Sequence, residues 1–336
     1  MARVLVTGGA GYVGSVCCGR LLAEGHSVEV IDDLSNGFAN AVPAGAVLHS
    51  IGIQDRDALS RVLKAGRFDT VFHFAAKASV PESVVNPGPF FDTNVAAGVA
   101  LLENIRAHGI RNLVFSSSAS VYGTPQMDCI QESCAKDPVN PYGESKLMFE
   151  EIAKSYVTAY GWSVVGFRYF NASGGGADWG ERHNPETHLI PLLLQTASGR
   201  RPFFELFGDD YDTPDGTCLR DFVHVLDIAE AHLLAMQKTN EPGFFAYNIG
   251  TGKSHSVKAV HELAETISGR PIRVRTGPRR AGDPSVLCAS PQKLIGELGW
   301  TPKHSSLDNI LSGAWEWEQK LCKQLLIGDA RNSHSF

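Results

Sequence analysis

Short apolar runs and longer amphipathic segments alternate along the first half of the chain. The short runs are nearly continuous in apolar residues, which is typical of strands in a sheet that is covered on both faces. Predicted strands lie at 3–8, 27–32, 69–75, 112–118 and 163–171. Predicted helices lie at 12–25, 57–66, 94–109 and 142–161. This alternation predicts an α/β fold with a Rossmann-like, doubly wound parallel sheet over residues 1–175.

The pattern becomes less regular after Asn171, where residues 172–186 are rich in glycine and polar side chains. We interpret this stretch as a domain boundary. Beyond it, residues 222–238 have the pattern of a strand followed by a helix, and further helical patterns occupy 189–199, 257–269 and 307–326. The second half is therefore predicted to form a smaller, mixed α/β domain.

The composition of the chain indicates which classes of protein it can belong to. The chain has 336 residues, of which 43% are hydrophobic and 20% charged, and its formal net charge is -6. These values are typical of a soluble globular protein and argue against a surface that binds nucleic acid or an anionic membrane. No apolar run of about 20 residues could span a bilayer, and the N-terminus lacks the pattern of a signal peptide. The seven cysteines are odd in number and lack C-x-x-C spacing, so we expect reduced thiols, no metal site and a cytoplasmic location.

A glycine-rich loop, TGGAGYVG, follows the first predicted strand and opens the first predicted helix. Gly8, Gly11 and Gly14 let the backbone approach a pyrophosphate, whose charge the helix N-terminus stabilises. Such loops are common, but here the second strand ends in Asp32, and the dinucleotide fingerprint expects an acid about 20 residues beyond the loop. A carboxylate there accepts hydrogen bonds from the adenosine ribose and repels a 2′-phosphate, which favours NAD over NADP. Asp33 adds a second negative charge.

The stretch NPYGESK places a phenol and an amine four positions apart at the start of a predicted helix, so Tyr142 and Lys146 share one face. A solvated helix face is the commoner reading of such a pattern. However, an ammonium at about 6 Å in an effective dielectric of about 20 stabilises a phenolate by about 3 kcal/mol. This is most of the roughly 4 kcal/mol needed to make a phenolate common at neutral pH, and oxidised nicotinamide could supply the rest. Ser118 ends a strand near the same edge, so Tyr142 is a credible base toward a hydroxyl while NAD accepts hydride.

The glycine loop, the acid-ended second strand, SSSASVYG and YGESK together resemble the extended short-chain dehydrogenase/reductase superfamily. In the second half, RYFNASG, HLIP, FGDDYDTPDGTCLRDFVHV, YNIGTG and RRAGDPSVLCAS are similar to the UDP-glucose 4-epimerase family, and the resemblance covers nearly the whole chain. It implies a bound NAD, a UDP-sugar substrate and a homodimer formed by helices of the first domain. It also implies that 218–246 rejoins the NAD-binding domain, which leaves 176–217 and 247–330 to bind the nucleotide sugar. Residues 331–336 are expected to form a frayed tail.

The resemblance also implies roles for single residues. Tyr142 takes the proton of the sugar 4-OH, Ser118 hydrogen-bonds the same oxygen, and Lys146 lowers the pKa of the tyrosine and holds the nicotinamide ribose. A transient 4-keto sugar then turns over and receives hydride on its other face, which inverts C4. The implied cofactor-binding residues are Gly8, Gly11, Tyr12, Val13, Gly14, Asp32, Asp33, Leu34, Ser35, Asn36, Gly37, Gly52, Ile53, Phe74, Ala75, Ala76, Asn94, Tyr142, Lys146 and Phe170. The implied substrate-binding residues are Ser118, Tyr142, Tyr169, Asn171, His188, Leu189, Phe207, Arg220, Arg280, Asp283 and Leu287.

Several positions depart from the family pattern. Gly52 stands where an acid commonly meets adenine, so that contact is missing or comes from elsewhere. Lys77 lies one place earlier than the family's lysine, which leaves its cofactor role open. His188 replaces a frequent asparagine, although an imidazole can also donate a hydrogen bond. Leu287 occupies a position where some members have a tyrosine that is associated with exclusion of N-acetylated sugars. The leucine therefore predicts some action on UDP-GlcNAc and UDP-GalNAc.

Other functions on the same fold make different demands on the sequence. A nucleotide-sugar dehydratase needs an Asp-Glu pair directly after the active-site hydroxyl residue, and here Ala119 and Ser120 stand there. A 4-epimerase of a UDP-pentose or UDP-uronate would share every catalytic residue named above, so this alternative stays open. A non-catalytic NAD-sensing protein would tolerate loss of Ser118, Tyr142 or Lys146, whereas all three are present.

Overall fold

The computed structural model describes residues 1–125, 127, 129–280 and 282–332, with side chains up to residue 325 in the last helix. Of the predicted frayed tail at 331–336, residues 331–332 end that helix and 333–336 lie outside the described residues. None of the described helices has the length and apolarity that crossing a membrane needs.

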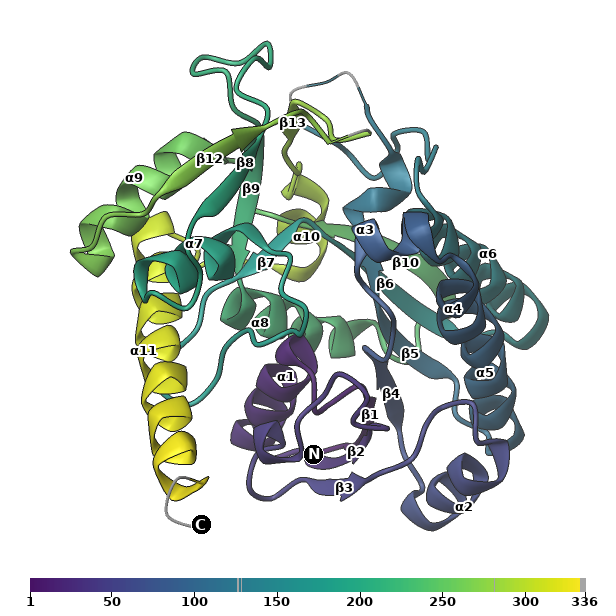
Figure 1. Ribbon diagram of the computed structural model, residues 1–336. Coiled ribbons are helices and arrows are strands. Elements are labelled where there is room, and N and C mark those ends of the chain that lie inside the picture. Colours follow the sequence, from purple (N-terminus) through teal and green to yellow (C-terminus); the bar gives the residue numbers. More distant parts are fainter. Residues whose placement is uncertain (126, 128, 281, 333–336) are drawn as a thin grey trace.

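Seven parallel strands form the large sheet, in the order β10-β6-β5-β4-β1-β2-β3 (Figure 1). They are β1 (Arg3–Thr7), β2 (Ser27–Ile31), β3 (Val47–His49), β4 (Thr70–His73), β5 (Asn112–Ser118), β6 (Ser163–Tyr169) and β10 (Gly243–Ile249). The chain first builds outward from β1 to β3 and then continues on the other side of β1 with β4. In such a sheet a crevice opens at this reversal, beyond the carboxyl ends of the strands. The predicted doubly wound parallel sheet is confirmed.

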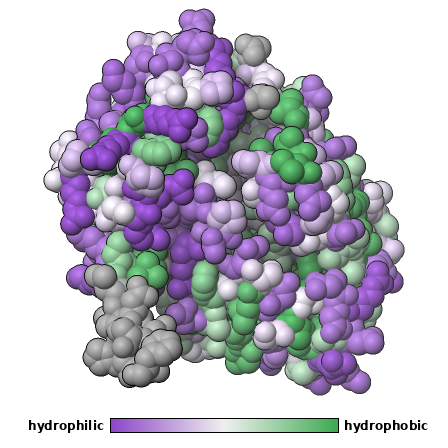
Figure 2. Space-filling model, viewed as in Figure 1, coloured by the Kyte–Doolittle hydropathy of each residue, from purple (hydrophilic) through white to green (hydrophobic). Residues whose placement is uncertain are grey.

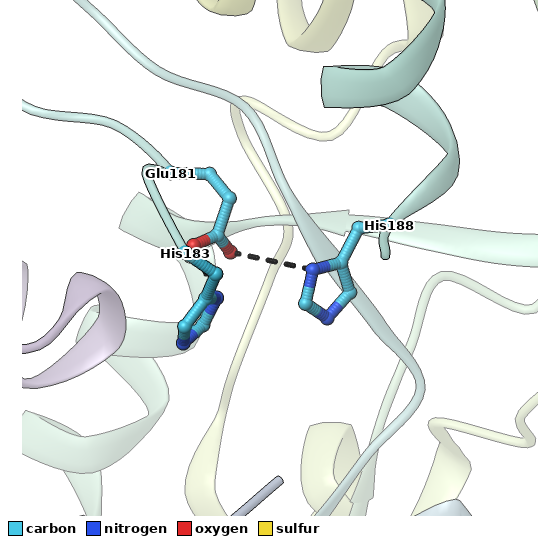
Figure 3. A group of neighbouring side chains, drawn as sticks. All are labelled: Glu181, His183 and His188. Atoms are coloured by element: carbon cyan, nitrogen blue, oxygen red, sulfur yellow. Dashed lines mark ion pairs between the residues drawn. The ribbon is translucent and has the colours of Figure 1, made fainter. Parts of the chain in front are cut away.

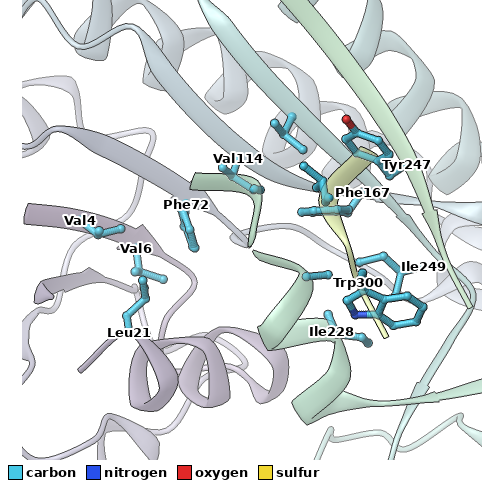
Figure 4. Packing of buried hydrophobic residues seen from close by; sticks show 14 of the residues in the cluster. Val4, Val6, Leu21, Phe72, Val114, Phe167, Ile228, Tyr247, Ile249 and Trp300 are labelled. Atoms are coloured by element: carbon cyan, nitrogen blue, oxygen red, sulfur yellow. The ribbon is translucent and has the colours of Figure 1, made fainter. Parts of the chain in front are cut away.

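Helices cover both faces of this sheet, as the near-continuous apolar strands require. One face carries α1 (Tyr12–Ala23) and α8 (Val225–Ala235), and the other carries α2 (Arg56–Gly66), α5 (Ala97–Ala107) and α6 (Pro141–Tyr160). Successive residues of a strand point to opposite faces. Val4 and Val6 therefore pack with Leu21 of α1 (Figure 4), whereas Leu5 packs with Leu101 of α5. Burying each such side chain contributes about 1.5–3 kcal/mol.

Shorter helical segments connect these elements. They are η1 (Ala39–Ala41), α3 (Val80–Val85), α4 (Gly88–Phe91), the π-helical turn η2 (Asp92–Ala96), η3 (Ala119–Tyr122) and η4 (Met236–Lys238). The segments α3, α4 and η2 pack against α6, and η3 follows directly after β5. They therefore border the carboxyl end of the large sheet.

A smaller domain lies beyond that end of the sheet (Figure 1). Its central strand, β9 (Leu219–His224), pairs with β7 (Asn171–Ser173), β11 (Ser254–Ser256) and β13 (Val286–Leu287). A second pair consists of β8 (Phe204–Phe207) and β12 (Val274–Gly277). The helices α7 (Leu189–Ala197), α9 (Val257–Ser268) and α11 (Leu307–Asn332) enclose a separate apolar core. The surface on this side is largely hydrophilic (Figure 2).

The domain boundaries differ from the predicted ones in two places. The segment 218–246 does not return as a unit, because β9 belongs to the smaller sheet, whereas α8 and β10 join the large one. Later, α10 (Gln292–Leu298) and Trp300 also pack against the large sheet (Figure 4). Asp227 of α8 fixes this second return, since its carbonyl oxygen accepts a hydrogen bond from Trp300 Nε1 at 2.8 Å. These long-range contacts have no periodic signal in the sequence.

Candidate active site

A cavity of about 1320 Å³ lies between the carboxyl ends of the large sheet and the smaller domain. Most of the residues implied for cofactor and substrate binding line it. The two exceptions are Leu34 and Asn94, which are not among the lining residues. Segments from both halves of the chain thus meet at one site, at the reversal of strand order where ligands bind in sheets of this kind.

The glycine loop forms a cradle at one end of this cavity. Gly8 has a φ of +73°, and a Cβ atom on it would lie 2.5 Å from the backbone nitrogen of Ala75. A Cβ on Gly14 would lie 2.2 Å from the carbonyl oxygen of Gly8. Helix α1 begins after Gly11. Its N-terminus has no side-chain cap, and its first turn has no acidic residue. A helix N-terminus left open in this way fits an anionic pyrophosphate.

Asp32 follows β2 beside the cradle and is buried. Its Oδ2 accepts a hydrogen bond from the backbone N–H of Ala10 at 3.0 Å, and its Oδ1 accepts one from Leu34 at 2.9 Å. Burial raises the pKa of Asp32, and these two hydrogen bonds oppose the rise. Each carboxylate oxygen keeps a further lone pair for a ribose hydroxyl. Leu34 contributes through its backbone, because its N–H donates to Asp32, and the chain then turns away at Leu34 in a left-handed conformation with a φ of 59°.

The helix α6 begins as its sequence predicts. Asn140 caps it by accepting a hydrogen bond from the N–H of Gly143 at 2.9 Å, and Pro141 occupies the first turn. The side chains of Tyr142 and Lys146 both line the cavity. Lys146 Nζ lies 5.9 Å from the centroid of the Tyr142 ring and donates a hydrogen bond to the carbonyl oxygen of Ser116 at 2.8 Å. The phenol and the amine are therefore neighbours, as their spacing indicates.

The electrostatics of this pair differ from the sequence prediction. Burial raises the pKa of Tyr142, and a hydrogen bond with Ser118 lowers it by a smaller amount. The prediction counted the attraction of the ammonium but not the loss of hydration, which disfavours a buried phenolate. Burial also lowers the pKa of Lys146 to about 8, and Glu150 opposes this shift. The amine therefore stays charged at neutral pH.

Two of the implied residues use their polar groups away from the cavity. The amide of Asn94 accepts from the N–H of Lys77 at 2.8 Å and donates to Ser145 at 2.9 Å, so it fixes the cavity wall from behind. Tyr169 lines the cavity, but its hydroxyl lies 2.9 Å from Nε2 of His232. His232 is fully buried, and burial lowers its pKa to about 4. It is therefore neutral, and its Nε2 can accept a hydrogen bond from the tyrosine hydroxyl.

The opposite end of the cavity carries two arginines. Arg220 pairs with Asp283, and the guanidinium of Arg280 lies 3.8 Å from the ring centroid of Phe207. A cation–π contact thus holds Arg280 against Phe207. Two guanidinium groups in one cavity fit a diphosphate, which they grip through paired hydrogen bonds.

Some lining residues were not predicted from the sequence. Glu181 and His183 line the cavity although they belong to the stretch interpreted as a domain boundary. The acid and two histidines at positions 181, 183 and 188 were the available signal. At Gly52, the side chain of Gln54 covers the place where the family has an acid, because a Cβ on that glycine would lie 2.2 Å from Gln54 Nε2. Lys77 lines the cavity, and its Nζ lies 3.7 Å from Oε1 of Glu82.

Comparison with known proteins gives the class to which this fold and cavity belong. A model of the NAD dependent epimerase/dehydratase family matches residues 4–250. The matched segment contains the glycine cradle, Asp32, the Tyr142 helix and Arg220. The chain belongs to this family.

Individual relatives narrow the assignment to the UDP-glucose 4-epimerase group. The chain is 45% identical to the UDP-glucose 4-epimerase of Corynebacterium glutamicum over 95% of its length and 96% of the relative's. It is 47% identical to that of Streptomyces lividans over 94% and 95% of the two chains. The crystal structure of the Brucella ovis UDP-glucose 4-epimerase in complex with NAD superposes with a TM-score of 0.92 at 40% identity, covering 95% of this chain and 98% of that one. The UDP-Glc/GlcNAc 4-epimerase of Campylobacter jejuni has a TM-score of 0.84 at 36% identity, covering 95% and 100%.

Proposed function

We propose that this protein is an NAD-dependent UDP-glucose 4-epimerase that interconverts UDP-glucose and UDP-galactose. The support is one cavity that holds a glycine cradle, a buried tyrosine beside a lysine, and two arginines at its far end. The cradle, Asp32 and Lys146 would hold NAD, whose nicotinamide supplies the hydride acceptor and donor for C4 of the sugar. Full-length similarity to enzymes of that name supports the same activity.

Tyr142 is the proposed base toward the sugar 4-OH. In its resting state it is a neutral phenol, because burial raises its pKa. Binding of a positively charged pyridine ring beside Lys146 would bring two cations to the phenol, and both favour the phenolate. The tyrosine then takes the hydroxyl proton and returns it after the keto sugar has turned over. This acid–base role needs the phenol, the amine and the sugar oxygen on one side of the cavity.

Ser118 is proposed to hold the same sugar oxygen. Its Oγ accepts a hydrogen bond from the backbone N–H of Ser120 at 3.1 Å, so its own hydrogen is free to point at Tyr142 or the substrate. The hydrogen bond between Ser118 and Tyr142 supports this orientation. A serine aligned in this way would relay the proton between the phenol and the sugar 4-OH.

A Tyr142→Phe variant tests the proposed base. It removes the phenolic oxygen and keeps the ring, so we expect bound NAD and UDP affinity to persist while turnover falls by about 100-fold or more, since positioned acid–base catalysis contributes about 10²–10⁴-fold. Turnover is measured by separating UDP-glucose from UDP-galactose after incubation, and NAD is measured in the supernatant of denatured protein. Full activity in this variant would show that Tyr142 is not the base.

The range of sugars is a further part of the proposal. Leu287 of β13 lines the cavity and is only partly buried, so we propose that the site also admits UDP-GlcNAc and UDP-GalNAc. The Campylobacter jejuni relative is named for both kinds of sugar, which supports this extension. Rates on a panel of UDP-hexoses, acetylhexosamines, pentoses and uronates test it. A Leu287→Tyr variant is expected to lose acetyl-sugar turnover selectively, and a wild-type enzyme without such turnover would contradict the extension.

We further propose a homodimer and a cytoplasmic location. Val85 of α3 and Met148 of α6 are exposed apolar residues on neighbouring helices of the first domain, which supports a self-association surface there. The seven cysteines are free thiols, as expected in a reducing compartment. Light scattering measures the mass of the wild type and of a Met148→Lys variant, and a monomeric wild type would contradict the dimer. Cell fractionation tests the location.

A further inference from the structure

Three side chains with metal-binding atoms meet in the stretch that precedes α7. Glu181, His183 and His188 lie next to one another (Figure 3). They offer ligand atoms that all lie within 4.8 Å of one another, and all three line the large cavity. We propose that they form a binding site for one divalent cation of the zinc type. The Tyr142 chemistry proposed above does not depend on this site.

The ion pairs inside the cluster leave single polar atoms without a hydrogen bond. Nδ1 of His183 lies 2.5 Å from Oε1 of Glu181. This nitrogen is nevertheless buried without an aligned hydrogen-bond partner among the described residues. Oε2 of Glu186 is also buried and likewise has no hydrogen-bond partner among them. Buried polar atoms of this kind are rare, and an ion is one recognised explanation for them. One such atom in the cluster and one on the neighbouring Glu186 therefore fit a bound ion.

The spacing of the atoms suits a small cation. Around tetrahedral zinc, with bonds of about 2.0–2.2 Å, ligand atoms stand roughly 3.3 Å apart. In the cluster, Glu181 Oε1 and His183 Nδ1 are closer than this, at 2.5 Å, and Glu181 Oε2 and His188 Nδ1 are farther apart, at 3.9 Å. Rotation of the Glu181 carboxylate and shifts of the rings would bring both distances to the required value. His188 Nδ1 would then exchange its contact with Glu186 Oε1, at 2.8 Å, for the ion.

The backbone that carries these ligands is held by its surroundings. Trp317 of α11 donates a hydrogen bond from Nε1 to the carbonyl oxygen of Glu181 at 2.9 Å. Arg182 donates to Asn40 at 2.7 Å, which ties the loop to the first domain and leaves its guanidinium engaged outside the cluster. Glu186 accepts from the backbone N–H of His188 at 2.8 Å. Groups that fix the ligands in this way are what metal sites require.

The chemistry of the ligands selects the cation. Two imidazoles and one carboxylate suit zinc and related transition metals, whereas calcium and magnesium prefer oxygen ligands. Glu186 adds a second negative charge, since its Oε1 lies 2.8 Å from Nδ1 of His188. Three protein ligands leave one coordination position open. That position is available to a water molecule or an anionic oxygen in the cavity.

Zinc titration of the EDTA-treated, reduced full-length protein tests the site. Isothermal titration calorimetry is expected to give one zinc ion per chain. Glu181→Gln and His183→Ala are expected to weaken zinc binding by at least about 10-fold, the lower range for loss of a group that supports a metal site. Glu181→Gln keeps the shape of the side chain, so it remains informative if the alanine variant does not fold. Cobalt is the second probe, because its visible spectrum reports whether thiolate is among its ligands.

Cysteine thiols are the competing ligands. The sulfur atoms of Cys129 and Cys288 lie 3.5 Å apart, so Cys129→Ser is the matched control and is expected to bind zinc as the wild type does. Zinc uptake that is lost in Cys129→Ser, or a thiolate band in the cobalt spectrum, would overturn the assignment. So would a wild-type protein that takes up no zinc, or a Glu181→Gln variant with unchanged affinity.

Discussion

Replacing Lys146 by methionine removes the positive charge beside Tyr142 and keeps a side chain of similar length. The ammonium lies 5.9 Å from the centre of the phenol ring. With that distance as the charge separation and an effective dielectric of about 20, its attraction for the phenolate is about 3 kcal/mol. Because about 1.36 kcal/mol corresponds to a tenfold change in rate, turnover at neutral pH is expected to fall by about 100-fold.

The pH dependence identifies the cause of that loss. Burial lowers the pKa of Lys146 to about 8, so the amine is charged below this pH and neutral above it. Its contribution is therefore present below about pH 8 and lost as the pH rises further. The ratio of wild-type to Lys146→Met turnover, measured from pH 6 to 10 (about two units on either side of the lowered pKa), is expected to shrink on the alkaline side.

A matched control lies two turns further along the same helix. Lys154 forms an exposed pair with Glu151 at 2.6 Å, and such pairs contribute little. Lys154→Met is therefore expected to keep wild-type turnover. The bound NAD of each variant is measured as well, because loss of cofactor would lower turnover for another reason. A Lys146→Met enzyme that retains NAD and wild-type turnover at every pH would refute the electrostatic role.

Three further results are expected. Gly8→Ala places a Cβ atom 2.5 Å from the backbone nitrogen of Ala75, so the purified variant is expected to lose bound NAD, and full cofactor content would contradict the cradle. Trp300→Ala empties a fully buried site and is expected to lower the free energy of unfolding by about 3–5 kcal/mol in urea denaturation; a loss below about 1 kcal/mol would mean that the site collapses or is not packed. Burial lowers the pKa of His232 to about 4, below the value of a histidine in the unfolded chain. The unfolded state therefore binds the proton more readily, and the free energy of unfolding is expected to fall by up to about 3 kcal/mol as the pH falls from about 6.5 to about 4. A His232→Gln variant whose free energy of unfolding depends on pH as strongly as that of the wild type would contradict the role given to His232.

Much of the first domain could be predicted because its signals are local. The near-continuous apolar strands specify a sheet covered on both faces, and the spacing of Gly8, Gly11 and Gly14 specifies a close approach of backbone segments. The cap at Asn140 and the four-residue spacing of Tyr142 and Lys146 likewise depend only on helix geometry. Each of these features is set by residues a few positions apart.

The burial of the site could not be predicted in the same way. The pKa of Tyr142 depends on how completely the folded chain excludes water from the phenol, and burial there outweighs the hydrogen bond with Ser118. Similarly, the hydroxyl of Tyr169 has two possible directions, and the position of His232, 63 residues away, decides between them. Solvation and partner choice are properties of the packed structure.

The amino-acid sequence by itself therefore determined the parallel sheet, the glycine cradle and the reactive pair on α6, because helix and strand periodicity and glycine spacing act over short distances. Only the tertiary structure decided that β9 leaves the large sheet, that α10 and Trp300 return to it, and that Glu181, His183 and His188 face one another. The physical reason is that these arrangements depend on contacts between distant segments, such as the hydrogen bond from Trp317 to Glu181, whose formation no local pattern encodes.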